Sequence, residues 1–390
     1  MRKFIYNFLK PLERTIESLN RIEISQSAIL NNLQIYQDLN PDSFIFPVLK
    51  SNAYGHGLEL IAQILKNQKL KYICVDSYYE YLQIKSTSYN CKTLIIGYNK
   101  PKNYKLFNFK KLAITVYDLE TIKALIQTHK PINIHLKIDT GMNRQGLLIN
   151  DLPNILNEIK KYPSLNLEGI MTHLADADNP NNDNYTQKQI QLFKKSLKIA
   201  KDRGFKPKYR HIANSAAAIK LKDPEFNSIR LGLGLYGYSA LDPNDHNYTK
   251  ISQLKPSLRF ISTIIQTKLV PKGAKISYNL TFNAANAIKI GIIPAGYYEG
   301  INRRLSNKGL FAYNSQKNGW QELPILGRIC MNLSICDLTN SNANEHDEII
   351  IINNQTKSLN SIENIAKLCN TIPYVITTNL AESIRRIIVN

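Results

Sequence analysis

Between residues 44 and 232, short apolar runs alternate with amphipathic stretches. The apolar runs are FIFPVLK (44–50), KYICVDS (71–77), TLIIGY (93–98), KLAITVY (111–117), INIHLKID (132–139), LEGIMTH (167–173), YRHIA (209–213) and SIRLG (228–232). Helical periodicity lies between several of them, in LELIAQIL (58–65), DLETIKALIQ (118–127) and TQKQIQLFKKSLKIAK (186–201). Continuous apolar strands that alternate with helices indicate a parallel sheet covered on the outside. Eight such runs predict a (β/α)8 TIM-like barrel.

After about residue 250 the pattern changes, and a mostly β domain is predicted. Its strand-like runs are FISTIIQTKLV (260–270), KISYNLTF (275–282), AIKIGIIPAGYY (287–298) and DEIIIINNQ (347–355), with helices predicted only in SIENIAKLCN (361–370) and LAESIRR (380–386). The apolar stripe of the first twenty residues predicts a helical extension that packs on the protein itself, in preference to a membrane surface. The predicted division is 1–20 for the extension, 21–250 for the barrel and 251–390 for the β domain.

Composition narrows the classes of partner. Hydrophobic residues make up 43% of the 390 residues, and no run is long enough for a transmembrane helix. The five cysteines lack metal-ligand spacing and are odd in number, which predicts reduced thiols, no metal site and a cytoplasmic protein. The net charge of +20 is spread along the chain without a nucleic-acid motif, so no nucleic-acid partner is expected.

The stretch PVLKSNAYGHG (47–57) places Lys50 at the end of a predicted barrel strand, where its amine could form a Schiff base with an aldehyde. In HIANSAAAIK (211–220), Ser215 is predicted to cap a helix whose N-terminus suits a phosphate. In SIRLGLGLYG (228–237), Gly232 and Gly234 let backbone amides approach an anion. An ordinary strand-end lysine, helix cap and tight turn explain each piece alone. Together they predict a phosphorylated aldehyde cofactor, pyridoxal 5'-phosphate.

PVLKSNAYGHG also resembles the cofactor-lysine motif of alanine racemases. The resemblance continues through IHLKIDTGMNRQG (134–146), GIMTHLADAD (169–178), HIANSAA (211–217), RLGLGLYG (230–237), ISYNLTF (276–282), GYYEGINRRLSN (296–307) and GRICMN (327–332). It implies a racemase that interconverts L-alanine and D-alanine and supplies D-alanine for peptidoglycan. It also implies a homodimer whose sites are shared between the two chains.

The resemblance assigns roles to individual residues. Lys50 would hold the cofactor as an aldimine and act as the base on one face of the substrate, and Tyr278 would be the base on the other. Arg230 would face the pyridine nitrogen, and His173 would lie beside it. The remaining cofactor contacts would be Tyr54, Asn214, Ser215, Gly232, Leu233 and Tyr374, the substrate contacts Arg144 and Met331, and the entrance residues Tyr297 and Arg303. Lys137, expected on the same strand as Arg144, matches a lysine that is often carbamylated; a plain ion-paired lysine is the alternative.

Some positions depart from the family pattern. Asn332 replaces an aspartate, which removes an anion beside the pocket, and Asn279 replaces a glycine. Tyr298 and Glu299 replace a common Ala-Asp pair.

Other functions remain open: a racemase of broader specificity, a decarboxylase of the same barrel class, a non-catalytic pyridoxal-phosphate-binding barrel, or an inactive family member. The second domain and the presence of Tyr278 favour the racemase.

Overall fold

The computed structural model describes residues 17–87, 89–179, 183–315 and 318–390, and the chain divides into two compact units. Among the described residues, one unit holds residues 26–256, and the other holds residues 17–25 together with residues 257–390. Strand β1 (Arg21–Ser25) belongs to the second unit because it pairs with β10 (Leu258–Thr263) and β19 (Arg385–Val389). This assignment differs from the predicted division at residues 21–25, since the partner strands are remote in sequence. It also differs at residues 251–256, which belong to the barrel unit and not to the β domain. The predicted N-terminal helix lies for the most part outside the described residues.

The first unit is built on an eight-stranded parallel sheet. Its strands are β2 (Phe44–Pro47), β3 (Tyr72–Val75), β4 (Lys92–Ile95), β5 (Leu112–Val116), β6 (Ile132–Lys137), β7 (Leu165–Met171), β8 (Tyr209–Ala213) and β9 (Ser228–Leu231). They follow the order β2-β9-β8-β7-β6-β5-β4-β3. A parallel bridge between Val48 and Cys74 brings the two edges of the sheet together, so the barrel is nearly closed. The barrel and its eight predicted strands are therefore confirmed.

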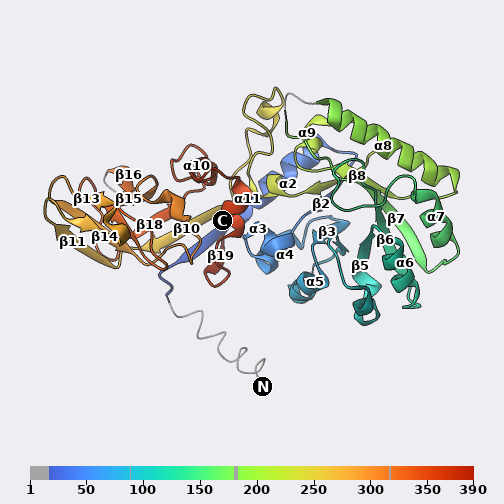
Figure 1. The fold of residues 1–390 in the computed structure, drawn as a ribbon, viewed down its shortest axis with the longest axis horizontal. Helices are drawn as coiled ribbons and strands as arrows, with labels where there is room; N and C mark the ends of the chain where they lie inside the picture. The colour runs from blue at the N-terminus through green and yellow to red at the C-terminus, as the bar shows by residue number, and fades with distance from the viewer. Residues whose placement is uncertain (1–16, 88, 180–182, 316–317) are drawn as a thin grey trace, which may run out of the picture. The chain divides into compact units, whose positions relative to one another are not determined.

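Helices cover the outside of this barrel (Figure 1). The predicted helices are present as α4 (Leu58–Leu65), α6 (Leu119–Ile126) and α8 (Asp183–Asp202). Further helices of the described residues are α2 (Gln26–Leu39), α5 (Tyr78–Ile84), α7 (Leu152–Lys160) and the short α9 (Ala217–Lys220), and the turn that begins at Lys50 is α3 (Lys50–Tyr54). Apolar strands can be buried on both faces only because the helices cover one face and the barrel interior fills the other. Inside, the rings of Phe46, Tyr72 and Tyr209 meet edge to face with centroids 5.2–5.6 Å apart.

The second unit is mostly β, as predicted. A six-stranded sheet has the order β16-β15-β18-β10-β1-β19, and a three-stranded sheet has the order β11-β14-β17. The strands not yet placed are β11 (Gln266–Val270), β12 (Lys275–Ile276), β13 (Phe282–Asn283), β14 (Ile288–Ile293), β15 (Leu310–Ser315), β16 (Gly319–Pro324), β17 (Ser334–Asp337) and β18 (Glu348–Ile352). The helix predicted from SIENIAKLCN is present as α10 (Ile362–Leu368).

One predicted helix of this unit is wrong. LAESIRR (380–386) forms turns that lead into β19, and the helix of this region is α11 (Pro373–Thr378). The parallel pairing of β19 with β1 draws Arg385 and Arg386 into a strand that no local periodicity signals. Pro373 at the first turn of α11 was the available sequence signal, because proline suits that position.

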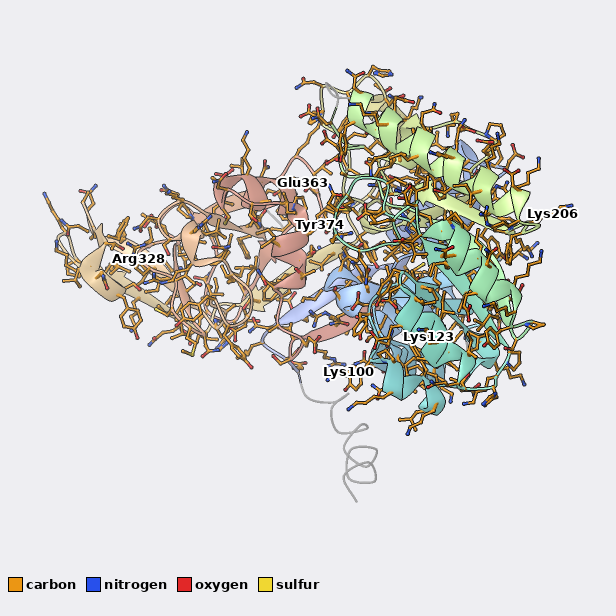
Figure 2. The ribbon with its side chains drawn as sticks, turned by 45° about the vertical axis from the view of Figure 1, so that its right-hand side comes forward. Lys100, Lys123, Lys206, Arg328, Glu363 and Tyr374 are labelled. Carbon is orange, nitrogen blue, oxygen red and sulfur yellow. The ribbon has the colours of Figure 1, made fainter. Side chains whose placement is uncertain are left out.

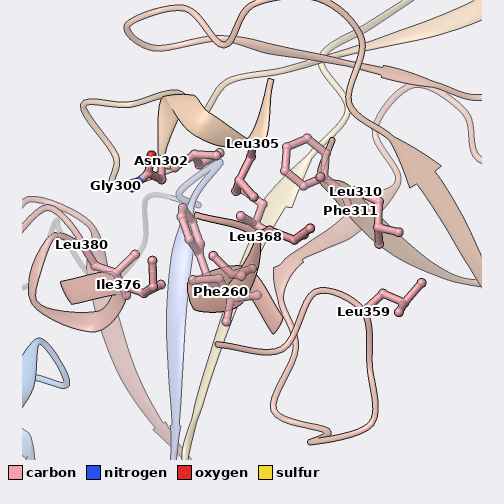
Figure 3. A pocket seen from close by; sticks show the side chains of 15 residues that line it. Phe260, Gly300, Asn302, Leu305, Leu310, Phe311, Leu359, Leu368, Ile376 and Leu380 are labelled. Carbon is pink, nitrogen blue, oxygen red and sulfur yellow. The ribbon is translucent and has the colours of Figure 1, made fainter. Parts of the chain in front are cut away.

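The second unit also contains an apolar pocket (Figure 3). Its lining includes Phe260 of β10, Leu368 of α10 and Ile376 of α11, and none of the residues predicted for the active site. No helix within the described part of the chain is long and apolar enough to span a membrane.

Candidate active site

Lysine, arginine and histidine side chains gather where the barrel strands end. Lys50 follows β2, Lys137 ends β6, His173 follows β7 and Arg230 lies in β9. The carboxyl ends of parallel barrel strands meet at one face, so these side chains share one mouth. Burial, followed by the charges of Arg230, Arg144 and Lys50, lowers the pKa of Lys137 to about 8. The site is therefore strongly electropositive and suited to an anionic ligand.

Lys50 begins a turn of unusual backbone conformation. The four residues Ser51–Tyr54 have φ between 52° and 56°, which is the left-handed region. Each such residue with a side chain costs about 1–2 kcal/mol relative to a right-handed one. Several bonds hold the turn: the Leu58 N–H donates to the Asn52 side-chain oxygen at 2.8 Å, and Nδ1 of buried His56 donates to the Ala53 and Tyr54 carbonyls. Strain kept next to Lys50 suggests that the direction of this amine matters.

Arg230 is buried among hydrogen-bond acceptors. Its Nη1 donates to Nδ1 and to the carbonyl of His211, at 3.1 and 2.9 Å. Its Nη2 donates to the Thr172 carbonyl at 2.6 Å and to Nδ1 of His173 at 3.1 Å. Burial lowers the pKa of Arg230 to about 10, so it stays charged at neutral pH. Its fifth N–H, on Nε, meets no acceptor among the described residues and is left for a ligand.

Arg230 fixes the protonation of the neighbouring histidines. A guanidinium only donates, so Nδ1 of His173 and of His211 must accept. His211 then carries its proton on Nε2 and donates to Nδ1 of His135 at 2.8 Å. Burial above all lowers the pKa of His173 and of His135 to about 3, so both rings are neutral. The sequence analysis missed His135 and His211; His135 lies two residues before Lys137, on the same strand face, and could have been found from that spacing.

A cradle of polar groups forms at the ends of β8 and β9. The Ser215 hydroxyl accepts from the N–H groups of Gly232 and Gly234, both at 3.2 Å. A Cβ on Gly232 would lie 2.7 Å from the Tyr54 hydroxyl oxygen, so these groups converge and only glycine leaves them room. Ser215 does not cap the following helix as predicted; the Asn214 side chain accepts from the Ala217 N–H instead, at 2.9 Å.

Hydroxyl and backbone N–H groups are the donors that bind phosphate in proteins. The charged donors of Lys50 and Arg230 at the same face suit the remainder of a phosphorylated ligand. Leu233 begins the short helix η4 (Leu233–Tyr236) beside this cradle. The residues at this face of the barrel thus fit a phosphorylated aldehyde such as pyridoxal phosphate, and Lys50 brings an amine to the same face. No group of three or more potential metal ligands occurs among the residues that the structure describes.

Lys137 and Arg144 are not on one strand, which corrects the sequence analysis. Lys137 is the last residue of β6, whereas Arg144 lies in the loop that follows. The Asp139 carboxylate turns the chain there by accepting from the N–H groups of Gly141 and Asn143 at 2.9 and 3.1 Å. The Lys137 amine donates to the Gln145 side-chain oxygen at 3.1 Å, a partner that the sequence did not indicate.

The second unit carries the other predicted residues. Tyr278 starts η6 (Tyr278–Leu280) between two residues with positive φ, Ser277 at 62° and Asn279 at 59°. The Ser277 hydroxyl donates to the Arg328 carbonyl at 2.5 Å, which ties this turn to the segment that leads to Met331. Of the two predicted entrance residues, Arg303 begins η7 (Arg303–Leu305) and Tyr297 lies in the loop before it. Tyr374 lies on α11 (Figure 2).

Three loops of this unit expose large side chains together. The N–H of Tyr297 donates to the Cys330 carbonyl at 3.0 Å, and the N–H of Tyr298 donates to the Met331 carbonyl at 2.9 Å. Tyr278 is 66% exposed and Met331 is 55% exposed, and Leu280 lies beside Tyr278 in sequence and is also exposed. These loops thus bring exposed apolar and aromatic side chains to the surface of the second unit.

The replacement at Asn332 is coupled to the one at Glu299. The Asn332 side-chain amide donates to one oxygen of the Glu299 carboxylate at 2.8 Å, and the Gly296 N–H donates to the other at 2.8 Å. The anion expected from an aspartate at position 332 is absent, and Glu299 supplies a carboxylate that the Asn332 amide contacts directly.

Comparison with known proteins gives one consistent family. The alanine racemase N-terminal domain matches residues 24–240, and the alanine racemase C-terminal domain matches residues 257–388. The chain is 33% identical over 372 residues to alanine racemase of Carboxydothermus hydrogenoformans, covering 94% of this chain and 98% of that protein.

Solved structures agree in fold. Alanine racemase of Bacillus anthracis with bound L-Ala-P is 28% identical, with a TM-score of 0.86 and coverage of 96% of both chains. Alanine racemase of Bartonella henselae with covalently bound pyridoxal phosphate is 23% identical, with a TM-score of 0.82, and covers 96% of this chain and 100% of that chain.

Proposed function

The chain belongs to the alanine racemase family, and we propose that it interconverts L-alanine and D-alanine with pyridoxal 5'-phosphate as its cofactor. The observation that carries this proposal is Arg230, a buried permanent donor with one N–H left for a ligand at the mouth that Lys50 enters. A donor-only group would keep a pyridine nitrogen unprotonated. That limits the stabilisation of a carbanion and favours return of a proton over other outcomes.

The barrel residues would hold the cofactor in two places. Lys50 would bind its aldehyde carbon covalently, and the cradle of Tyr54, Ser215 and Gly232 would bind its phosphate. Family likeness adds Tyr374 as a further phosphate contact. When bound, the cofactor draws electrons from the α-carbon of the amino acid, which makes its proton acidic. His173, held neutral beside Arg230, would lie near the reacting groups.

The chain's own groups would then move the proton. Tyr278 removes the α-proton of L-alanine, and Lys50 supplies a proton from the opposite face; in the reverse direction the two exchange roles. Arg144 and the Met331 N–H would hold the substrate carboxylate, while Tyr297 and Arg303 would restrict the entrance. The D-alanine formed would serve peptidoglycan synthesis in the cytoplasm.

We further propose that each site is shared in a homodimer, with Lys50 from one chain and Tyr278 from the other. The exposure of Tyr278 and Met331 on the joined loops supports a partner there. Purified protein with added cofactor should interconvert the alanine enantiomers, and a faster reaction with serine would favour the broader racemase. Cofactor binding without turnover would instead favour a non-catalytic barrel protein.

A complementation experiment tests the shared site. Lys50→Ala and Tyr278→Ala should each be inactive, yet mixing and refolding them together should restore activity. Random pairing makes about half of the dimers mixed with one intact site of two, so recovery approaches about a quarter of the native activity. Chain exchange without recovered activity would mean that each site lies within one chain.

A further inference from the structure

The turn after Lys50 is tied to the next barrel strand by one carboxylate. Glu80, on α5, accepts from the Ser51 N–H at 2.6 Å and from the Asp76 N–H at 2.6 Å. Ser51 directly follows Lys50, and Asp76 directly follows β3. Because an ionised acceptor makes shorter and stronger hydrogen bonds, this carboxylate is a firm link between the two segments.

Glu80 departs from the usual geometry of its motif. Ser77-x-x-Glu80 is a capping box, and the Ser77 hydroxyl accepts from the Glu80 N–H at 3.3 Å as such a box requires. In a capping box the acid normally accepts from the Ser77 N–H. Here the Glu80 oxygens accept instead from the N–H of Asp76, one residue earlier, and from the N–H of Ser51. The cap is therefore also used to hold the lysine turn.

Backbone hydrogen bonds on both sides of Lys50 restrict its conformation. Before it, the Leu49 N–H donates to the Cys74 carbonyl at 2.7 Å; after it, the Ser51 N–H donates to Glu80 at 2.6 Å. The peptide group before Leu49 is thus fixed to the neighbouring strand, and the peptide group between Lys50 and Ser51 is fixed to the helix. Since Ser51 has left-handed φ, loss of its acceptor allows this residue to relax and the lysine stem to turn.

We propose that Glu80 is a positioning residue, which sets the direction of the Lys50 amine for its proton transfer. This inference rests on the proposed function, in which Lys50 acts on D-alanine and Tyr278 on L-alanine. A misdirected Lys50 slows only its own transfer. The α-deuterium isotope effects of the two directions therefore change in opposite senses, whereas a loss of stability or cofactor would leave both isotope effects unchanged.

The test compares Glu80→Gln with Glu59→Gln, an exposed glutamate on the adjacent α4. Gln keeps one acceptor oxygen and presents a donor to the other amide, so kcat should fall roughly 10–100-fold with KM little changed. The α-deuterium isotope effect should rise with labelled D-alanine, where Lys50 removes the labelled proton, and fall with labelled L-alanine, where removal by Tyr278 limits the rate less. Glu59→Gln should behave as the native protein does.

A second measurement is independent of turnover. In cofactor-free protein, hydrogen exchange of the Ser51 amide should become roughly tenfold faster in Glu80→Gln and stay unchanged in Glu59→Gln. If Glu80→Gln folds poorly, Glu80→Asp replaces it in the test. Aspartate is one methylene shorter and cannot span both amides, so the same changes in the isotope effects are expected. Isotope effects that match those of the native protein in both directions, measured on the folded variants, would overturn the proposal. A native protein that does not racemise alanine would instead refute the proposed function.

Discussion

Lys137 should carry a carbamate, formed when its neutral amine adds carbon dioxide. Burial and the charges of Arg230, Arg144 and Lys50 lower its pKa from 10.5 to about 8. At neutral pH this shift makes the reactive neutral amine about 300-fold more abundant than on an ordinary lysine. The product is an anion among cations, so the same charges that expel the proton also stabilise the carbamate.

The assay is carbon NMR in 13C-labelled bicarbonate. We expect one protein-bound carbamate signal that grows as the pH rises from 6 to 8, because the neutral amine must form first. Lys137→Arg keeps a cation but cannot form a carbamate, so its spectrum should lack the signal. The variant should retain cofactor and lose kcat, since the anion that would orient Arg144 is missing.

Two outcomes would refute this reasoning. If the native protein and Lys137→Arg give the same carbamate spectrum, the Lys137 amine is unmodified and pairs only with Gln145. A signal that weakens as the pH rises would contradict the requirement for the neutral amine.

Two further predictions follow from the contacts. Gly232→Ala places a Cβ 2.7 Å from the Tyr54 hydroxyl oxygen, so cofactor affinity should fall while the melting temperature changes little; unchanged affinity in a titration would contradict the cradle. Asn332→Asp replaces a hydrogen bond by a like-charge contact with Glu299, so it should lower the melting temperature at neutral pH and less so in acid, where carboxylates are protonated. Asn332→Ala loses only the bond, so a pH dependence equal to that of the Asp variant would rule out charge repulsion.

Much of the barrel was predictable because its signals are local. Apolar runs such as INIHLKID and capped amphipathic helices reflect burial on both faces of a strand and one face of a helix, which neighbouring residues determine. The strand-end positions of Lys50, Lys137 and Arg230 follow from the same runs, because parallel strands bring their ends to one face.

The tertiary structure decided what depends on partners remote in sequence. Strand β1 joins the second unit because β10 and β19 pair with it. The same pairing makes the end of LAESIRR part of strand β19 and not of a helix. The left-handed turn after Lys50 persists because Glu80 and its other partners offset the strain, and no local propensity favours it. The neutral state of His173 arises from burial beside Arg230, a property of the packed barrel that the residue itself does not have.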